Sequence, residues 1–106
     1  MSGEQRHPRH DLDAAFQTPL RFSLMAVLRP GLEIDFVTLR TNLEANDSTL
    51  SKAITYLQQQ EYVVVRKTAI VQQPRTRVLV TARGSRAFAR HLTALKKIAE
   101  GITELP

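Results

Sequence analysis

The stretch NDSTLSKAITYLQQQEYVVVRK, residues 46–67, contains a change of hydrophobic period that decides the fold. In its first part the apolar residues are spaced i, i+3, i+4 and i+7, which places them on one face of an α-helix. These residues are Leu50, Ala53, Ile54 and Leu57. The second part is β-branched and alternating, which is typical of a strand. We therefore predict a helix over residues 48–60, capped by Asn46 or Asp47, and a strand over residues 62–67 directly after it.

The chain that follows completes a hairpin and adds a long helix. A second alternating segment covers residues 76–81, behind a loop around residues 72–74. A last helix begins within residues 82–85 and runs to about residue 100, where Gly101 ends it. Its apolar side chains are spaced alternately by four and three residues, a repeat that favours packing against another helix. They are Phe88, Leu92, Leu95, Ala99 and Ile102.

Two more helices are expected before residue 46. Thr18 and Pro19 open the first, because threonine caps free amides and proline suits the first helical position. Pro30 stops that helix, and Asp35 caps a second one over residues 36–43. A short helical turn at residues 13–16 and an edge strand at residues 32–34 complete this half.

The expected fold class is mainly α with a small β-hairpin. Two short helices joined by a tight turn and followed by a two-stranded ribbon are the arrangement of a winged helix-turn-helix. The added C-terminal helix, at about residues 84–100, is the expected dimerisation element. Residues 1–11 show no periodicity and are expected to form a mobile tail before a single domain over residues 12–106.

Composition limits the classes of function. The 106 residues suffice for one core, and the chain has no Cys, so disulfides and thiolate sites are excluded. No apolar run reaches the roughly 18 residues of a membrane span, and a cytoplasmic location without membrane contact is expected. The net charge is +5, and residues 62–99 contain nine Lys and Arg but no acid. Such a segment attracts polyanions, nucleic acid first, although a basic face kept for solubility is the plain alternative.

Several short motifs in order resemble a known family. They are Thr18-Pro19-Leu20-Arg21, Asp35-Phe36, Ser48-Thr49-Leu50-Ser51, Tyr62-Val63, Pro74-Arg75-Thr76 and Leu79-Val80-Thr81-Ala82-Arg83-Gly84. Over residues 14–98 this set is similar to the small stand-alone winged-helix transcriptional regulators of the MarR and ArsR kind. The resemblance implies a prokaryotic, dimeric DNA-binding regulator whose third helix enters the major groove while the hairpin touches backbone or minor groove. Two features depart from the family: Gln60 and Glu61 replace a usual glycine, and the Asp-x-Arg wing motif is missing.

The candidate DNA-binding residues come from the third helix and the hairpin. If the apolar stripe faces inward, helical geometry turns the hydroxyl, amide and amino side chains outward, where they can bond base edges or phosphates. These are Ser48, Thr49, Ser51, Lys52, Thr55, Tyr56 and Gln59. The hairpin adds cations that neutralise phosphates, namely Arg66, Lys67, Arg75 and Arg77. An ordinary solvated helix face, and pairing of some arginines with acids such as Glu61, are the alternatives.

The last helix is the candidate dimer interface. Its seam of Phe88, Leu92, Leu95, Ala99 and Ile102, with His91 beside it, needs either the first helix or a second subunit to cover it. A homodimer is expected. The sequence does not reveal whether a small-molecule effector exists; a pocket for one, if there is any, is expected at the dimer interface.

No catalytic or metal site is expected. The sequence has no Gly-rich phosphate loop and no nucleophile elbow, so neither an enzyme nor a cofactor is predicted. His7 and His10 lack a third ligand nearby. The predicted function is sequence-specific regulation of transcription by a homodimer on an operator. A winged-helix adaptor for other proteins and a nonspecific nucleic-acid binder are the alternatives.

Overall fold

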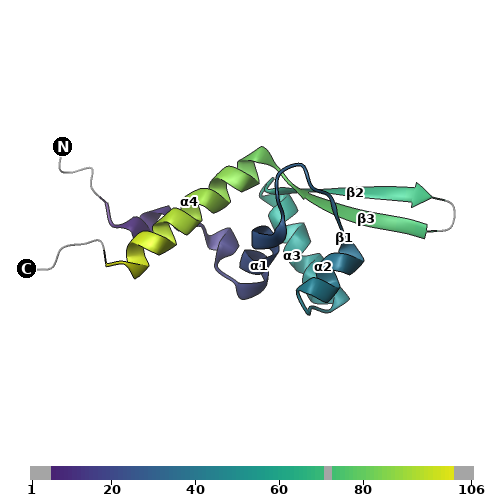
Figure 1. Cartoon of the computed structure of the whole chain (residues 1–106), viewed down its shortest axis with the longest axis horizontal. Helices are drawn as coiled ribbons and strands as arrows, with labels where there is room; N and C mark the ends of the chain where they lie inside the picture. The colour runs from purple at the N-terminus through teal and green to yellow at the C-terminus, as the bar shows by residue number, and fades with distance from the viewer. Residues whose placement is uncertain (1–5, 71–72, 102–106) are drawn as a thin grey trace, which may run out of the picture.

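The computed structural model describes residues 6–70 and 73–101, and it forms one elongated body of 65 × 25 × 19 Å (Figure 1). The described helices are two 3-10 turns, η2 (Pro8–Asp11) and η3 (Ala14–Phe16), and four α-helices: α1 (Pro19–Val27), α2 (Phe36–Asn42), α3 (Asp47–Gln59) and α4 (Ala82–Ala99). The strands are β1 (Ile34–Asp35), β2 (Val63–Ile70) and β3 (Gln73–Val80). The predicted fold class, a winged helix with an added C-terminal helix, is confirmed.

The core forms where α1, α2 and α3 meet the base of the hairpin. All four residues of the predicted α3 stripe are buried, and Leu50 and Leu57 are completely so. Each fully buried leucine contributes roughly 1.5–3 kcal/mol of transfer free energy. Two helix starts are capped as expected: the Thr18 hydroxyl accepts a hydrogen bond from the amide of Arg21, and the Asn46 side chain accepts one from the amide of Thr49. Asp35 occupies the N-cap position of α2 as predicted, but its side chain makes no capping hydrogen bond.

Helix α3 ends with a residue in the left-handed conformation, a position that is usually a glycine but is Glu61 here. Glu61 has a φ of 64°, in the left-handed region, and the next amide, of Tyr62, donates to the carbonyl of Leu57 at 2.9 Å. The Thr81 hydroxyl donates to the carbonyl of Glu61 at 2.8 Å, which ties this turn to the start of α4. The departure from the family's usual glycine therefore leaves the geometry of the helix end intact.

The three strands form one antiparallel sheet in the order β1-β3-β2. The hairpin is longer than predicted, because β2 continues to Ile70 and β3 already begins at Gln73. Pro74 is therefore part of a strand and not of the loop that the sequence predicted. Proline is tolerated there because β1 pairs only with Arg77 and Val78, so that one edge of β3 is open at Pro74.

An aromatic cluster fixes α4 to the rest of the chain. The ring centroid of Phe16 lies 5.2 Å from those of Tyr62 and Phe88, and the ring of Phe22 lies 5.3 Å from that of Phe88. The first turn of α4 also crosses the chain at Tyr62, where only the glycine at position 84 leaves room for the Tyr62 carbonyl. These contacts anchor the N-terminal half of α4.

The C-terminal half of α4 extends beyond this core and lies beside η2 (Figure 1). Residues 1–11 were expected to lack regular structure, but within the described part Pro8–Asp11 forms a 3-10 turn. The missed signal is local: His7 accepts a hydrogen bond from the amide of Arg9, and Pro8 suits the first position of a helical turn. Residues 1–5 lie outside the described residues.

Candidate nucleic-acid interface

The outward face of α3 is polar and exposed. Its capping and its four buried residues set the rotation of the helix, so the hydroxyl and amide side chains opposite them face solvent. Six of the seven predicted residues are exposed, namely Ser48, Thr49, Ser51, Lys52, Thr55 and Gln59. The structure thus brings together on one surface the donors and acceptors that the sequence predicted there.

Tyr56 is placed differently from the prediction. It is half-buried, and the guanidinium of Arg21 lies 4.0 Å from the centroid of its ring. Arg21 is itself held by a hydrogen bond of 2.7 Å from its Nε to the carbonyl of Ala15. Because Tyr56 lies at the edge of the apolar stripe, packing against α1 turns it away from the six exposed residues.

A hollow of about 310 Å³ separates α3 from the hairpin. It is lined on one side by Ser51 and Thr55 of α3 and on the other by Lys67 and Thr76 of the strands, with apolar side chains at its base. Gln58, which the sequence interpretation omitted, also lines it. The signal was available, since Gln58 follows Ser51 by seven residues and therefore shares its face.

The register of the hairpin separates the four predicted cations. Arg66 pairs with Arg77 and Lys67 pairs with Thr76, and successive residues of a strand point to opposite faces. Lys67 thus lies on the face that carries the buried Val63 and Val78, toward α3. Arg66, Arg75 and Arg77 share the other face of the hairpin.

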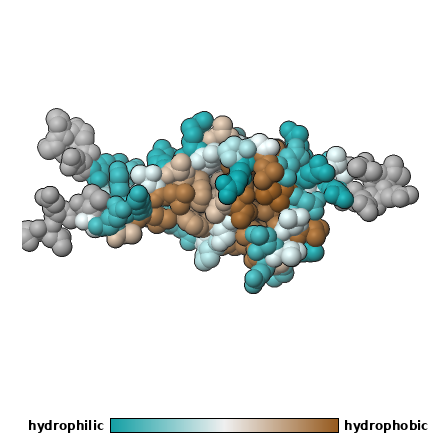
Figure 2. Space-filling model, in the orientation of Figure 1, coloured by the Kyte–Doolittle hydropathy of each residue, from teal (hydrophilic) through white to brown (hydrophobic). Residues whose placement is uncertain are grey.

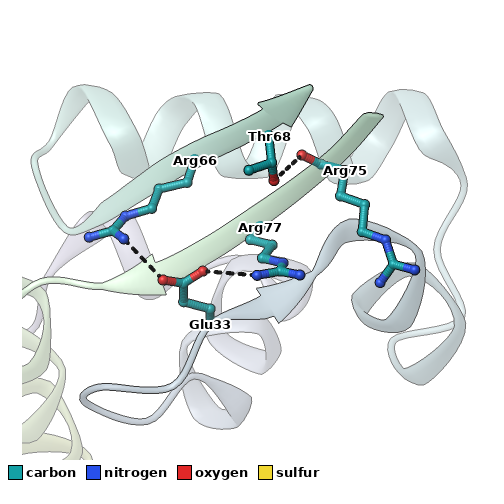
Figure 3. Close-up of polar contacts among 5 residues, drawn as sticks. All are labelled: Glu33, Arg66, Thr68, Arg75 and Arg77. Carbon is teal, nitrogen blue, oxygen red and sulfur yellow. Dashed lines mark hydrogen bonds and ion pairs between the residues drawn. The ribbon is translucent and has the colours of Figure 1, made fainter. Parts of the chain in front are cut away.

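On that outer face the arginines meet an acid that the sequence interpretation did not single out. Glu33, which precedes β1, forms ion pairs with two of them (Figure 3). Its Oε2 lies 3.1 Å from the guanidinium of Arg66, and its Oε1 lies 3.7 Å from that of Arg77. The guanidinium of Arg75 points away from Glu33 in the same view, while its carbonyl accepts a hydrogen bond from the Thr68 hydroxyl at 3.5 Å. The alternative that some arginines pair with an acid of the N-terminal half therefore holds for Arg66 and Arg77, but the acid is Glu33 and not Glu61.

The predicted seam of α4 is only partly exposed. Leu92 and Leu95 are 42% and 36% exposed, as is the neighbouring Ile98 at 37%, and Ala99 is exposed as well. Phe88 instead packs into the aromatic cluster, and Ile102 lies outside the described residues. Figure 2 shows apolar surface along α4 and around α1.

His91 is a core residue and does not belong to the exposed seam. It is 2% exposed, and its Nδ1 accepts a hydrogen bond of 2.9 Å from the amide of Asp13. Burial lowers the pKa of this imidazole, against a smaller opposing effect of the Asp13 carboxylate. The buried face of α4, made of Gly84, Ala87, His91 and Ala94, adjoins the leucines but is not the face that the sequence predicted to pack.

Two further hollows flank α4. One of about 490 Å³ is mainly apolar and lies between η3, α1 and α4, with Phe16, Phe22 and Leu95 among its walls. The other, of about 330 Å³, is lined by Tyr62 and by three arginines of α4, Arg83, Arg86 and Arg90. The basic segment of the sequence therefore becomes two separate basic surfaces, one on the hairpin and one on α4.

Within the described residues no group of His, Asp and Glu side chains has the proximity that a metal ion requires. In the same part of the chain no helix is both long and apolar enough to cross a membrane.

Comparison with known proteins supports this description. Residues 20–99 match the family model described as a winged helix DNA-binding domain. No curated protein matches the chain. A transcriptional regulator homologue from Pyrococcus horikoshii OT3 has a similar structure, with a TM-score of 0.81 and 24% identity over 94% of this chain and 100% of its own.

Two other solved regulators share the fold at lower identity. The M. tuberculosis transcriptional regulator MosR, solved in complex with DNA, has a TM-score of 0.66 and 20% identity over 91% of this chain and 68% of its own. BpsR of Bordetella bronchiseptica, whose DNA binding is regulated by 6-hydroxynicotinic acid, has a TM-score of 0.67 and 16% identity over 94% of this chain and 77% of its own. The resemblance indicated by the sequence motifs is thus confirmed.

Proposed function

Because this chain belongs to the winged helix DNA-binding domain family, we propose that it regulates transcription by binding double-stranded DNA at a specific operator as a homodimer. The family and the fold are those of DNA-binding transcriptional regulators. The observation that carries the proposal for this chain is the surface on which Ser51 and Thr55 of α3 face Lys67 of the hairpin across one hollow.

The face of α3 suits the reading of bases. A helix of 13 residues is about 20 Å long, and the major groove of B-DNA, about 12 Å wide, admits such a helix. Lys52 can donate to a guanine edge, while hydroxyls such as that of Thr55 bond to bases or contact the thymine methyl group. In this proposal α3 supplies specificity.

The hairpin suits contact with the backbone. Its cations are flexible side chains on a two-stranded ribbon, and they can neutralise phosphates without regard to sequence. Lys67 lies nearest to α3, and Arg75 lies on the far side of the ribbon toward its tip. In this proposal the hairpin supplies sequence-independent affinity and orientation.

The exposed residues of α4 suit a second copy of the chain. Leu92, Leu95 and Ile98 leave apolar surface in water, and burial of such surface is worth about 25 cal/mol per Å². Two-fold dimers are the commonest assembly of soluble proteins. A dimer of this kind presents two α3 helices, so the operator is expected to be an inverted repeat with half-sites near multiples of about 10 base pairs apart.

Selection of bound sequences from random duplex DNA tests the proposal, followed by affinity measurements on the selected and a scrambled duplex at several salt concentrations. A regulator prefers the selected duplex by about 10³-fold or more. A similar salt slope on both duplexes without preference would identify a nonspecific binder, and the absence of binding to either would favour an adaptor for proteins.

A further inference from the structure

We propose that Glu33 sets the strength with which the hairpin holds DNA, because its carboxylate competes with phosphate for Arg66 and Arg77. The inference rests on the proposed function and adds to it a residue, Glu33, that lowers the affinity of the hairpin for DNA.

The starting point is a pair of like charges. Arg66 and Arg77 are directly opposite each other on neighbouring antiparallel strands, a placement that is unfavourable unless an anion lies between them. Glu33 provides that anion, with its Oε2 3.1 Å from Arg66 and its Oε1 3.7 Å from Arg77 (Figure 3). One carboxylate thus uses both oxygens to bridge two guanidinium groups.

The position of the carboxylate is set by the backbone. Glu33 immediately precedes β1, in which Ile34 pairs with Val78 and Asp35 pairs with Arg77. This pairing places residue 33 at the edge of the hairpin irrespective of what the arginine side chains do. Within the described part of the chain Asp35 makes no ion pair with Arg77, so it does not duplicate the bridge.

The bridge is accessible to a competing anion. The side chain of Arg66 is 64% exposed and that of Arg77 is 40% exposed, so phosphate can approach both guanidinium groups. Exposed ion pairs are weak and screened by salt, and guanidinium binds phosphate as well as carboxylate. Exchange of Glu33 for a DNA phosphate is therefore feasible, but the carboxylate stays nearby and repels the phosphate.

The net charge at this place decides the outcome. Two arginines and one glutamate carry +1, whereas the two arginines alone would carry +2. The attraction of the hairpin for the DNA backbone is reduced accordingly, and because no base is read here, the reduction applies to every duplex. Removal of the carboxylate should therefore strengthen binding to matched and unrelated DNA alike.

The test substitutes Glu33→Gln, which keeps the shape and removes the charge. We expect affinity to rise about 3- to 10-fold on both the selected and the scrambled duplex, and the salt slope to steepen by about one. Glu100→Gln is the matched control, since it changes the net charge equally at an exposed position at the end of α4. An unchanged affinity for Glu33→Gln, or an equal gain for Glu100→Gln, would overturn the inference.

A double-mutant cycle identifies the mechanism. In a chain that carries Arg66→Gln and Arg77→Gln, the further change Glu33→Gln should raise DNA affinity distinctly less than it does in the unmodified chain, because no guanidinium is left to be released and only the direct repulsion between carboxylate and phosphate is removed. A gain of the same size in both backgrounds would show that Glu33 does not act through the two arginines. Thermal unfolding of each variant verifies that the fold is retained.

Immobilised heparin separates this inference from the proposed function. Glu33→Gln should elute from heparin at higher salt than the unmodified protein, since any polyanion competes with the carboxylate. Later elution together with no binding of any duplex would refute the DNA-binding proposal and leave the competition at Glu33 standing. Unchanged elution would refute the competition, whatever the protein does with DNA.

Discussion

The two ends of the molecule expose opposite kinds of surface. At the hairpin end the exposed side chains include the cations Arg66 and Lys67, and Lys67 lines a hollow shared with α3. At the far end of α4 the exposed side chains include Leu92, Leu95 and Ile98. The long axis of 65 Å keeps these surfaces well apart (Figure 1).

This difference indicates two kinds of partner. Exposed cations gain little from one another and much from a polyanion, whereas exposed leucines gain from another apolar surface. In the proposed function the first end binds DNA and the second binds a copy of the chain, and α4 connects the two ends.

Gly84→Ala should disrupt the packing of the first turn of α4 against the chain at Tyr62, and so destabilise the helix that links the two ends. A Cβ at this position would overlap the carbonyl oxygen of Tyr62, and backbone cannot move aside as a flexible side chain does. We expect a loss of roughly 3 kcal/mol in the free energy of unfolding, at the upper end for overpacking. Urea denaturation measures it, with Ser85→Ala as a control that should change stability by less than about 0.5 kcal/mol. Equal stability of the two variants would contradict the close crossing.

Leu95→Glu should abolish the proposed dimer contact at the end of α4, because it places a charge among the exposed leucines. We expect a monomer in sedimentation and a loss of about 100-fold or more in operator affinity, because two linked half-site contacts become one. Thr93→Glu adds the same charge to an exposed part of α4 outside the leucine face and should leave the dimer intact. A monomeric unmodified protein at micromolar concentration that still binds a selected site would refute the dimer and the inverted repeat.

Within the hairpin end, base reading and phosphate contact should separate. Lys52→Ala and Thr55→Ala should each reduce the preference for the selected over the scrambled duplex, by about 1–3 kcal/mol for a good base contact. Arg75→Ala should lower the affinity for both duplexes equally and make the dependence of affinity on salt concentration shallower by about one in the logarithmic slope. Competition binding at several salt concentrations distinguishes these outcomes. Equal losses on both duplexes for Lys52→Ala and Thr55→Ala would remove base reading from those positions.

The smallest expected effect concerns pH and the anchoring of α4. Burial lowers the pKa of His91 below the 6.5 of a free imidazole, so the unfolded chain takes up a proton before the folded one does. The contribution of His91 to the free energy of unfolding is therefore fully present above pH 6.5, and it declines as the pH falls from 6.5 toward the pKa of His91 in the folded protein. Protonation of Nδ1 would also break its hydrogen bond with the amide of Asp13.

Urea unfolding at pH 7.5, 6.5 and 5.5 measures this decline, and His91→Gln should flatten it in that range. Hydrogen exchange should show that, at the lower pH, protection is lost at η3 and α4 before it is lost in α3. An identical pH profile for His91→Gln would mean that other groups cause the decline.

Local patterns determined most of the fold. The stripe of α3, its cap at Asn46 and the start of α1 at Thr18 involve residues at most seven positions apart, so the sequence alone predicts them. The change of period after α3 likewise predicted the hairpin, although Pro74 hid its true length. For the same reason six of the seven α3 candidates were predicted correctly as exposed: the buried stripe fixes the opposite face.

Contacts between distant residues required the tertiary structure. His91 meets Asp13 across 78 positions, and Arg66 meets Glu33 across 33, and no periodicity links residues so far apart. The apolar and basic residues of α4 and the hairpin are visible in the sequence, but which of them face the chain itself depends on what packs beside them. The four α-helices, the hairpin and their order follow from the sequence alone, because these elements depend on neighbouring residues. The burial of His91, the contact of Tyr56 with α1 and the bridge from Glu33 to two arginines depend on the tertiary structure, because packing between distant elements selects those partners.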